Sequence, residues 1–247
     1  MMSNDELPLS LTAGGPFDPR PGQRPWEAGP PGDEGHWQRD QGYHLPDDVV
    51  PQGDRVLRNV IGAFSQEALD KAEAHLVTRA QHRLWQSPPE ATFDRAHLQQ
   101  IHRRLFGDVY PWAGQNRTVP IARGATGSAA PSEFMPPEQL DESLDLWAGA
   151  LHAEHCLQDM GQEHFIDRLG DMYAALNYIH PFREGNGRTQ REFFTQLAAA
   201  AGYALDWSVG FTAGQEQAQH NEWSKLAHLG NREPLKAWLS QVVQPGA

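Results

Sequence analysis

Twelve consecutive residues, from His180 to Arg191, combine a side chain that can move a proton with a backbone that can hold an anion; they read His-Pro-Phe-Arg-Glu-Gly-Asn-Gly-Arg-Thr-Gln-Arg. Pro181, Gly185 and Gly187 predict that one helix ends here and that another begins after a tight loop. The first N–H groups of a helix face such a loop beside the positive end of the helix dipole, so the loop forms a nest for an anion. Phosphate is the ligand that this arrangement favours.

The side chains of the segment agree with a phosphate ligand. Arg188 and Arg191 are three residues apart at the start of the second helix, so both can reach phosphate oxygens beyond the nest. Glu184 offers a carboxylate oxygen for Mg²⁺, and Asn186 can donate a hydrogen bond without adding charge. His180 has an ordinary pKa of about 6.5, which suits a general base at neutral pH. The segment therefore predicts a nucleotide site with a base.

Taken singly, these residues also have structural interpretations. A histidine at a helix C-terminus is a favourable partner of the helix dipole, and Gly-Asn-Gly is a common turn. An arginine pair at a helix start is harder to explain, because cations there oppose the dipole unless an anion lies between. The combination favours function.

Helices must position this loop. Apolar residues recur at helical spacing from Tyr43 onward, with Ser65 and Asp94 as caps of the first two helices and Gly107 as a stop. One stretch, Arg117–Ala122 and the residues after it, has the character of a short hairpin, and Pro120 confines its strand to an edge. We expect an all-α fold, a helical bundle with a small β-hairpin flap. The expected helices span 65–85, 94–106, 137–155, 162–179, 187–201, 214–229 and 233–243.

The first 42 residues differ in composition from the rest. They contain seven prolines and seven glycines and few branched aliphatic residues. Such a segment cannot bury enough apolar surface to offset its ordering entropy. We predict a disordered tail over residues 1–42 and one folded domain over residues 43–247.

Charge and composition exclude several classes of function. The chain has 247 residues and a formal net charge of −12, which disfavours general nucleic-acid binding. Its single cysteine excludes an internal disulfide and a multi-cysteine zinc site. No apolar run approaches the roughly 20 residues that span a bilayer, and the N-terminus has no secretory pattern. We expect a soluble, cytoplasmic protein; alternatively, the tail serves to deliver the chain into a host cell.

The segment from His180 to Arg191 resembles the signature of Fic-domain proteins, H-P-F-x-[D/E]-G-N-G-R-x-x-R, at every specified position. The resemblance extends over most of residues 43–243, including His102–Gly114, Arg117–Val119 and Tyr178–Pro181. It implies a protein adenylyltransferase, which transfers AMP from ATP to a hydroxyl side chain (Ser, Thr or Tyr) of a target protein and releases pyrophosphate. ATP and Mg²⁺ are then the implied co-substrate and cofactor.

The resemblance also implies roles for individual residues. His180 would deprotonate the attacking hydroxyl, and Glu184 would bind Mg²⁺. Arg188 and Arg191 would orient the β- and γ-phosphates, and Phe182 would anchor the loop. The residues that would hold the α- and β-phosphates are Gly185, Asn186 and Gly187.

Two further sites follow from the resemblance. In Fic proteins a flap beside the active site pairs with an extended segment of the target, which matches edge-strand addition. An ordinary surface hairpin remains an alternative here. Candidates for the adenine pocket follow the motif, namely His220, Asn221 and His228. The flap residues would be Val119, Pro120, Ile121, Ala122, Arg123 and Gly124.

Many Fic proteins carry a self-inhibitory motif, [S/T]-x-x-x-E-[G/N]. The nearest match here, Thr212–Gln217, ends in Gln and lies within the domain. The chain thus resembles Fic toxins that are silenced by a separate small antitoxin protein, which would supply the missing glutamate to Arg191. Toxin-type relatives modify the ATPase subunits of type II topoisomerases, so these are implied as candidate targets.

Two other functions stay open. Doc-type relatives have a lysine at the position of Gly187 and transfer a phosphate, whereas Gly187 and the intact arginine pair favour AMP transfer. The second alternative is a nucleotide-sensing binding module without catalysis. His180 argues against it, because a sensor needs no base.

Overall fold

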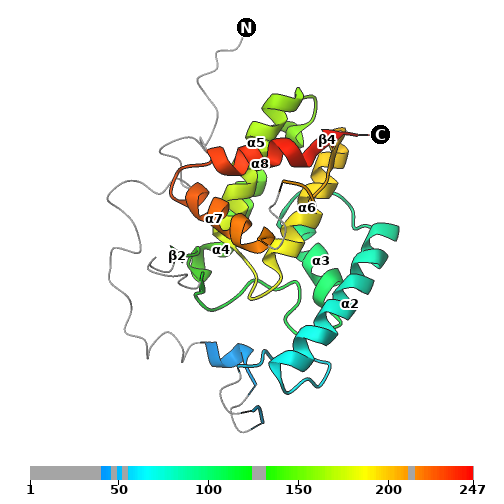
Figure 1. Ribbon diagram of the computed structural model, residues 1–247, viewed down its shortest axis with the longest axis vertical. Coiled ribbons are helices and arrows are strands. Elements are labelled where there is room, and N and C mark those ends of the chain that lie inside the picture. Colours follow the sequence, from blue (N-terminus) through cyan, green and yellow to red (C-terminus); the bar gives the residue numbers. More distant parts are fainter. Residues whose placement is uncertain (1–39, 46–48, 52–54, 124–131, 211–214, 247) are drawn as a thin grey trace.

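The computed structural model describes residues 40–45, 49–51, 55–123, 132–210 and 215–246 (Figure 1). The predicted tail, residues 1–42, lies outside these ranges except for residues 40–42. The described part is mostly helical, as the sequence predicts, and none of its helices is long and apolar enough to cross a bilayer. Its helices are α2 (Gln66–Gln86), α3 (Arg95–Phe106), α4 (Leu140–Ala153), α5 (Gln162–Ile179), α6 (Asn186–Ala200), α7 (Glu216–His228) and α8 (Glu233–Val242). Short 3-10 turns are η1 (Asp40–Tyr43), η2 (Pro137–Gln139) and η3 (His155–Leu157).

The predicted caps set the ends of the first two long helices. The side chain of Ser65 accepts a hydrogen bond from the amide of Ala68, and that of Asp94 accepts one from the amide of His97. Each bond satisfies an N–H group that has no partner within its helix. Helix α3 ends at Phe106, directly before the predicted stop at Gly107.

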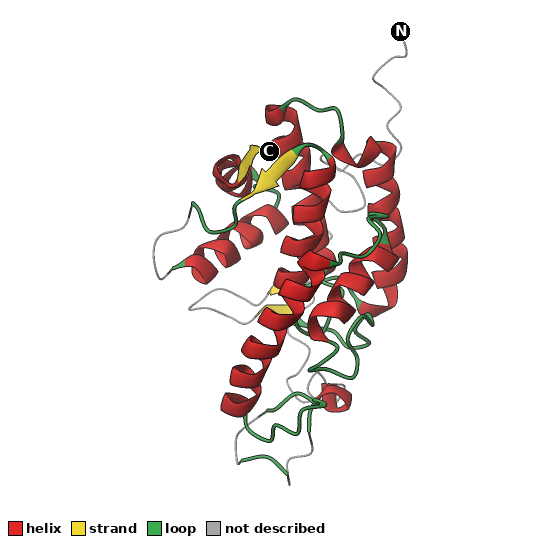
Figure 2. Cartoon of the chain, turned by 90° about the vertical axis from the view of Figure 1, so that its right-hand side faces the viewer, coloured by secondary structure: helices red, strands yellow, loops and turns green. Residues whose placement is uncertain are grey.

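Two small antiparallel sheets accompany the helices. The predicted hairpin is confirmed, but its strand β1 (Ala122–Arg123) begins at Ala122 rather than Arg117 and pairs with β2 (Ser132–Glu133). The expectation of a single hairpin is wrong, because β3 (Tyr203–Leu205) pairs with β4 (Val243–Pro245). Figure 2 shows this second pair as yellow arrows near the C-terminus.

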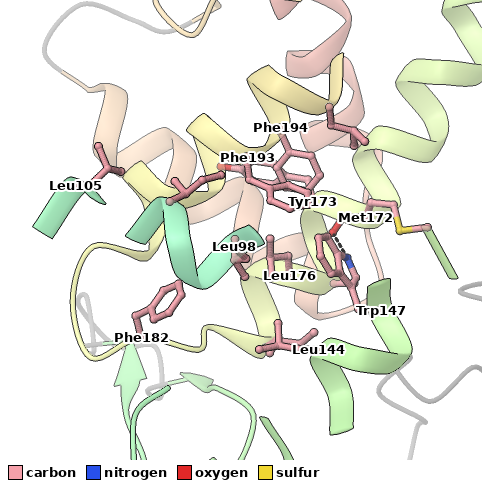
Figure 3. Packing of buried hydrophobic residues seen from close by; sticks show 14 of the residues in the cluster. Leu98, Leu105, Leu144, Trp147, Met172, Tyr173, Leu176, Phe182, Phe193 and Phe194 are labelled. Atoms are coloured by element: carbon pink, nitrogen blue, oxygen red, sulfur yellow. Dashed lines mark hydrogen bonds between the residues drawn. The ribbon is translucent and has the colours of Figure 1, made fainter. Parts of the chain in front are cut away.

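Helices α5 and α6 form the middle of the domain (Figure 1). Helix α5 packs against α4, α6, α7 and α8, while α6 also packs against α3, which in turn lies on α2. Because both helices carry apolar side chains on several faces, they are surrounded by other elements. The loop that joins them is therefore held between rigid supports. Their fully buried side chains include Met172, Tyr173, Leu176, Phe193 and Phe194 (Figure 3). Phe165, Leu169 and Leu197 are fully buried as well.

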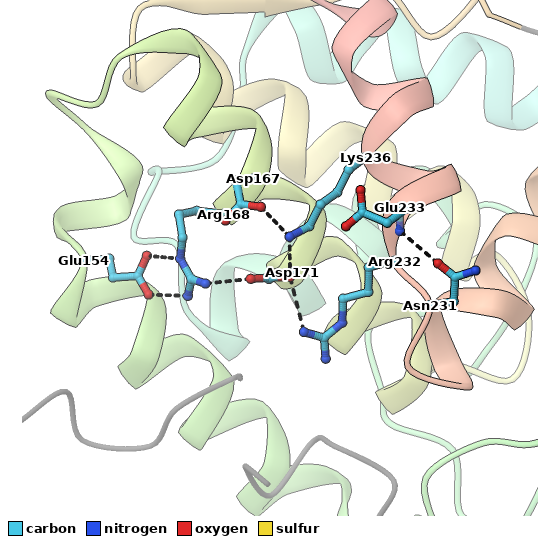
Figure 4. A network of polar contacts seen from close by, with 8 residues as sticks. All are labelled: Glu154, Asp167, Arg168, Asp171, Asn231, Arg232, Glu233 and Lys236. Carbon is cyan, nitrogen blue, oxygen red and sulfur yellow. Dashed lines mark hydrogen bonds and ion pairs between the residues drawn. The ribbon is translucent and has the colours of Figure 1, made fainter. Parts of the chain in front are cut away.

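Charged side chains tie α5 to α8 and to the end of α4 (Figure 4). Arg168 forms two bonds with Glu154, of 2.8 and 2.5 Å, and a third with Asp171 at 2.6 Å. Asp171 also meets Lys236 at 3.1 Å and Arg232 at 3.2 Å, while its own side chain is 8% exposed. The attraction between opposite charges in such a network offsets much of the free energy that it costs to remove them from water.

Candidate active site

His180 caps the C-terminus of α5 in a left-handed backbone conformation, with φ of 48°. Its Nδ1 lies 3.1 Å from the carbonyl oxygen of Asn177. A carbonyl only accepts hydrogen bonds, so Nδ1 carries the proton and Nε2 is the basic nitrogen of the neutral ring. The ring also stacks on Phe134, with 3.8 Å between centroids. The geometry thus fixes both the tautomer and the plane of the predicted base.

The loop after His180 is held in shape by two of its own side chains, Phe182 and Asn186. Phe182 is buried, as predicted for an anchor, and stacks on the ring of His102 at 3.9 Å. The amide of Asn186 folds back on the loop: Oδ1 accepts from the Phe182 amide at 2.9 Å and Nδ2 donates to the Phe182 carbonyl at 2.7 Å. A phosphate contact of Asn186 would therefore come from its backbone N–H.

The nest itself begins at Gly185, the N-cap of α6, which has φ of 84°. No side chain of the described residues caps this helix, so its first amides face the loop, as an anion site requires. A Cβ atom added at Gly185 would lie 2.4 Å from Cζ of Phe106, whereas one added at Gly187 would meet no atom of the described residues within 4 Å. Gly185 thus allows the loop to pack closely on Phe106, whereas Gly187 leaves open space beside the first turn of α6.

Charged groups surround the nest. Arg188 Nη2 lies 2.6 Å from Oε1 of Glu73 and 3.3 Å from Oε1 of Glu184, and its guanidinium lies over the Phe106 ring. The other carboxylate oxygen of Glu73 accepts from the hydroxyl of Tyr110. Sequence reasoning missed Glu73, which lies on α2 more than a hundred residues before Arg188. Nothing in the local pattern of α2 distinguishes it.

Arg191 and Glu184 complete the predicted phosphate and metal groups. Arg191 is exposed, and its Nε donates to the carbonyl of Gly187 at 3.3 Å. Glu184 accepts from the amide of Gly185 at 2.9 Å through Oε1. No group of three or more potential metal ligands occurs among the described residues. One carboxylate beside a nest instead fits Mg²⁺ that is held mainly by phosphate oxygens and water.

His102 on α3 connects the nest to the turn that ends at Gly114. Its Nε2 lies 2.9 Å from the carbonyl oxygen of Glu184, and its Nδ1 accepts from the Gly114 amide at 2.8 Å. Burial lowers the pKa of His102 to about 4, so the ring is neutral at pH 7. It therefore donates from Nε2 and accepts at Nδ1. The sequence singles out this residue only as part of the resemblance, without a role.

The hairpin lies against His180 through Phe134, which follows β2. Of the predicted flap residues, Val119 is buried, Pro120 and Ile121 are half-buried, and Ala122 and Arg123 form β1. Gly124 lies outside the described residues.

The adenine candidates lie on α7. The rings of His228 and Tyr178 are nearly perpendicular, at 4.5 Å between centroids, near the end of α5 that carries His180. Asn221 is half-buried. His220 bonds the hydroxyl of buried Tyr173 at 2.7 Å and packs on Trp238, so it belongs to an aromatic cluster.

Several bacterial proteins resemble this chain in sequence. It is 37% identical to the protein adenylyltransferase VbhT of Bartonella schoenbuchensis over 184 residues, 74% of this chain but only 36% of that relative. It is 37% identical to y4lH of Sinorhizobium fredii, covering 81% of it, and 34% identical to Fic of Escherichia coli, covering 88%. These two are named as probable protein adenylyltransferases.

Solved structures of Fic domains also resemble this chain. The N-terminal Fic domain of a VirB-translocated Bep effector from Bartonella quintana, with bound ADP, is 29% identical with a TM-score of 0.70 and matches over 82% of this chain and 97% of that one. BepC from Bartonella tribocorum, with bound AMPPNP, is 27% identical with a TM-score of 0.69 over 83% and 100% of the two chains. The Fic/DOC family matches residues 92–198, which contain the base and the nest. With these relatives covered over most of their length, the chain belongs to the Fic/DOC family.

Proposed function

We propose that this chain transfers AMP from ATP to a Ser, Thr or Tyr hydroxyl of a target protein. Membership of a family with named protein adenylyltransferases makes it an enzyme of that class. The observation that carries the chemistry is the bond from His180 Nδ1 to the carbonyl of Asn177, which leaves Nε2 as the base. The hydroxyl oxygen attacks the α-phosphorus, its proton passes to Nε2, and the bond to the bridging oxygen breaks to release pyrophosphate.

The nucleotide would bind with its phosphates at the start of α6. Gly185, Asn186 and Gly187 would donate backbone amides to the α- and β-phosphates, and Arg188 and Arg191 would orient the β- and γ-phosphates. The ADP and AMPPNP bound in the Bartonella Fic structures support ATP as co-substrate. Adenine would lie near α7, with Asn221 and His228 as its candidate contacts.

Mg²⁺ would be held by Glu184 together with phosphate oxygens. When bound, it would neutralise charge on the phosphates. Glu184 is half-exposed beside the nest, and its Oε1 contacts only Gly185 and Arg188 among the described residues. A small movement of this side chain would exchange its contact with Arg188 for one with the cation.

The hairpin would dock the target. Its edge offers backbone groups to an extended segment, and Phe134 links it to the ring of His180. An unpaired edge tolerates many sequences, so it fits a protein substrate. The ATPase subunit of a type II topoisomerase is the proposed target, in the cytoplasm or, alternatively, in a host cell.

Regulation would come from a separate small antitoxin protein. In the described part of the chain, no carboxylate pairs with Arg191, which is exposed. Residues 212–214 and the side chain of Glu216 lie outside the described part. With a separate inhibitor, Glu216→Gly leaves the rate of transfer within about twofold, because no contact to Arg191 is lost. A large rise would place the inhibitory carboxylate inside the chain.

The decisive experiment follows label from ATP. The purified full chain is incubated with a bacterial lysate and either [α-³²P]ATP or [γ-³²P]ATP. We expect protein labelling only from the α-label, and a loss of at least about 100-fold in His180→Ala, since a general base contributes about 10² to 10⁴. His164→Ala, an exposed histidine on the same helix, is the matched control and keeps the wild-type rate.

Other outcomes point to other functions. Labelling from the γ-phosphate would show phosphate transfer. Binding of AMPPNP without labelling from either position would support a nucleotide sensor. A His180→Ala variant that keeps more than about a tenth of the rate would remove His180 as the base.

A further inference from the structure

Arg117 is a buried cation whose guanidinium bonds four backbone carbonyls. The residue is 2% exposed. Nε donates to the carbonyl of His180 at 2.9 Å, Nη1 to that of Val119 at 2.9 Å, and Nη2 to those of Met135 and of Ile179, the latter at 3.4 Å. Every donor atom of the planar group is therefore used by the backbone.

The charge of Arg117 is balanced by the end of a helix. In the described part of the chain it forms no ion pair with a carboxylate, and burial lowers its pKa to about 10, so it stays protonated at pH 7. The carbonyls of Ile179 and His180 belong to the C-terminus of α5, where the helix dipole favours a cation. The end of α5 and the guanidinium thus stabilise each other.

The four carbonyls come from three segments that the reaction would need in register. One segment carries His180, the second leads into β1 at Val119, and the third leaves β2 at Met135. Two backbone bonds support the same junction: the Arg117 amide donates to Pro181 at 2.8 Å, and the Met135 amide donates to Tyr178 at 3.1 Å. One rigid side chain therefore spans the helix end and both legs of the hairpin.

We propose that Arg117 is a positioning residue that fixes the target-docking hairpin relative to His180. The inference rests on the proposed function, because only a protein substrate needs the hairpin and the base in register. The printed bonds of the Arg117 guanidinium end on four carbonyls outside residues 185–188, so nucleotide binding should not depend on it. Lysine at this position keeps the charge but is a point donor, and it cannot span carbonyls on both sides of the junction.

The test compares Arg117→Lys with Arg79→Lys, an exposed arginine on α2, in the full chain. Hydrogen exchange reports the hairpin without requiring any activity: we expect the amides of residues 134–135 to exchange at least tenfold faster in Arg117→Lys, with α6 within twofold of wild type. Label transfer from [α-³²P]ATP to lysate proteins should fall at least tenfold, while the Kd for AMPPNP stays within twofold. The control should match wild type in all three.

Several results would overturn the proposal. Unchanged hairpin exchange or label transfer within twofold would do so, as would AMPPNP binding that falls in parallel with transfer. If Arg117→Lys does not fold, Arg117→Gln, which buries no charge, is measured in the same way; failure of both to fold shows a folding role only and overturns positioning. A wild type that labels nothing refutes the proposed function instead, and the exchange measurement still tests the junction.

Discussion

Two glycines in the nest should respond to the same substitution in opposite ways. Gly185 has φ of 84°, and an added Cβ would lie 2.4 and 2.5 Å from two atoms of the Phe106 ring. That ring is fully buried and lies 4.8 Å from the ring of His102, so it has little room to move. The left-handed backbone costs about 1–2 kcal/mol and the overpacking about 1–3, so Gly185→Ala should lower the free energy of unfolding by roughly 2–5 kcal/mol.

Gly187→Ala is the matched comparison. It lies in the first turn of α6 and has open space around the added Cβ. Alanine there should leave the free energy of unfolding unchanged or raise it by up to about 1 kcal/mol. The methyl group would nevertheless narrow the nest, so we expect AMPPNP to bind about tenfold more weakly, a loss of about 1.4 kcal/mol.

Urea unfolding followed by circular dichroism, together with AMPPNP titration, separates the two effects. If Gly185→Ala were as stable as wild type, the Phe106 ring would not support the loop as described. If Gly187→Ala bound AMPPNP as tightly as wild type, the open space beside residue 187 would not be the phosphate site.

Three further changes test the surroundings of the site. Glu73→Gln removes the charge that holds Arg188, so the KM for ATP should rise several-fold with a smaller effect on kcat, measured by label transfer at saturating target. Asp171→Ala should lower the free energy of unfolding by about 3 kcal/mol because it removes the carboxylate that Arg168, Arg232 and Lys236 share, whereas Asp108→Ala, which breaks an exposed pair, should lower it by less than about 1 kcal/mol. The pKa of His102 is about 4 in the folded chain and 6.5 in the unfolded chain, so between these pH values the unfolded chain binds a proton that the folded chain does not. The free energy of unfolding that is present above pH 6.5 is therefore lost as the pH falls toward 4. This loss should be roughly 3 kcal/mol larger in wild type than in His102→Gln.

Local signals were enough to predict the helices. Ser65 and Asp94 cap where predicted, because a side-chain oxygen directly before a helical run can accept from an amide of the first turn that has no partner within the helix. The strands were harder to predict from the sequence. Val243–Pro245 continues the apolar pattern of α8, and its pairing with Tyr203–Leu205 depends on a partner some forty residues away. Likewise residues 117–119, which have the character of a strand, are held by two other bonds: the Arg117 amide donates to the carbonyl of Pro181, and the Arg117 side chain donates to that of Val119.

The motif from His180 to Arg191 supplies the reactive groups, but their placement comes from elsewhere in the chain. Three of its bonds to distant residues are made at the carbonyl of His180 by Arg117, at the carbonyl of Glu184 by His102, and at the guanidinium of Arg188 by Glu73. A motif search sees none of these contacts, because they join residues about 60 to 115 positions apart. The first two bonds give a donor to a backbone carbonyl, and a buried carbonyl without a donor is costly. It follows that the loop keeps its shape only while α2, α3 and the connection after α3 stay in place, so changes in those elements should reach the chemistry without touching a motif residue.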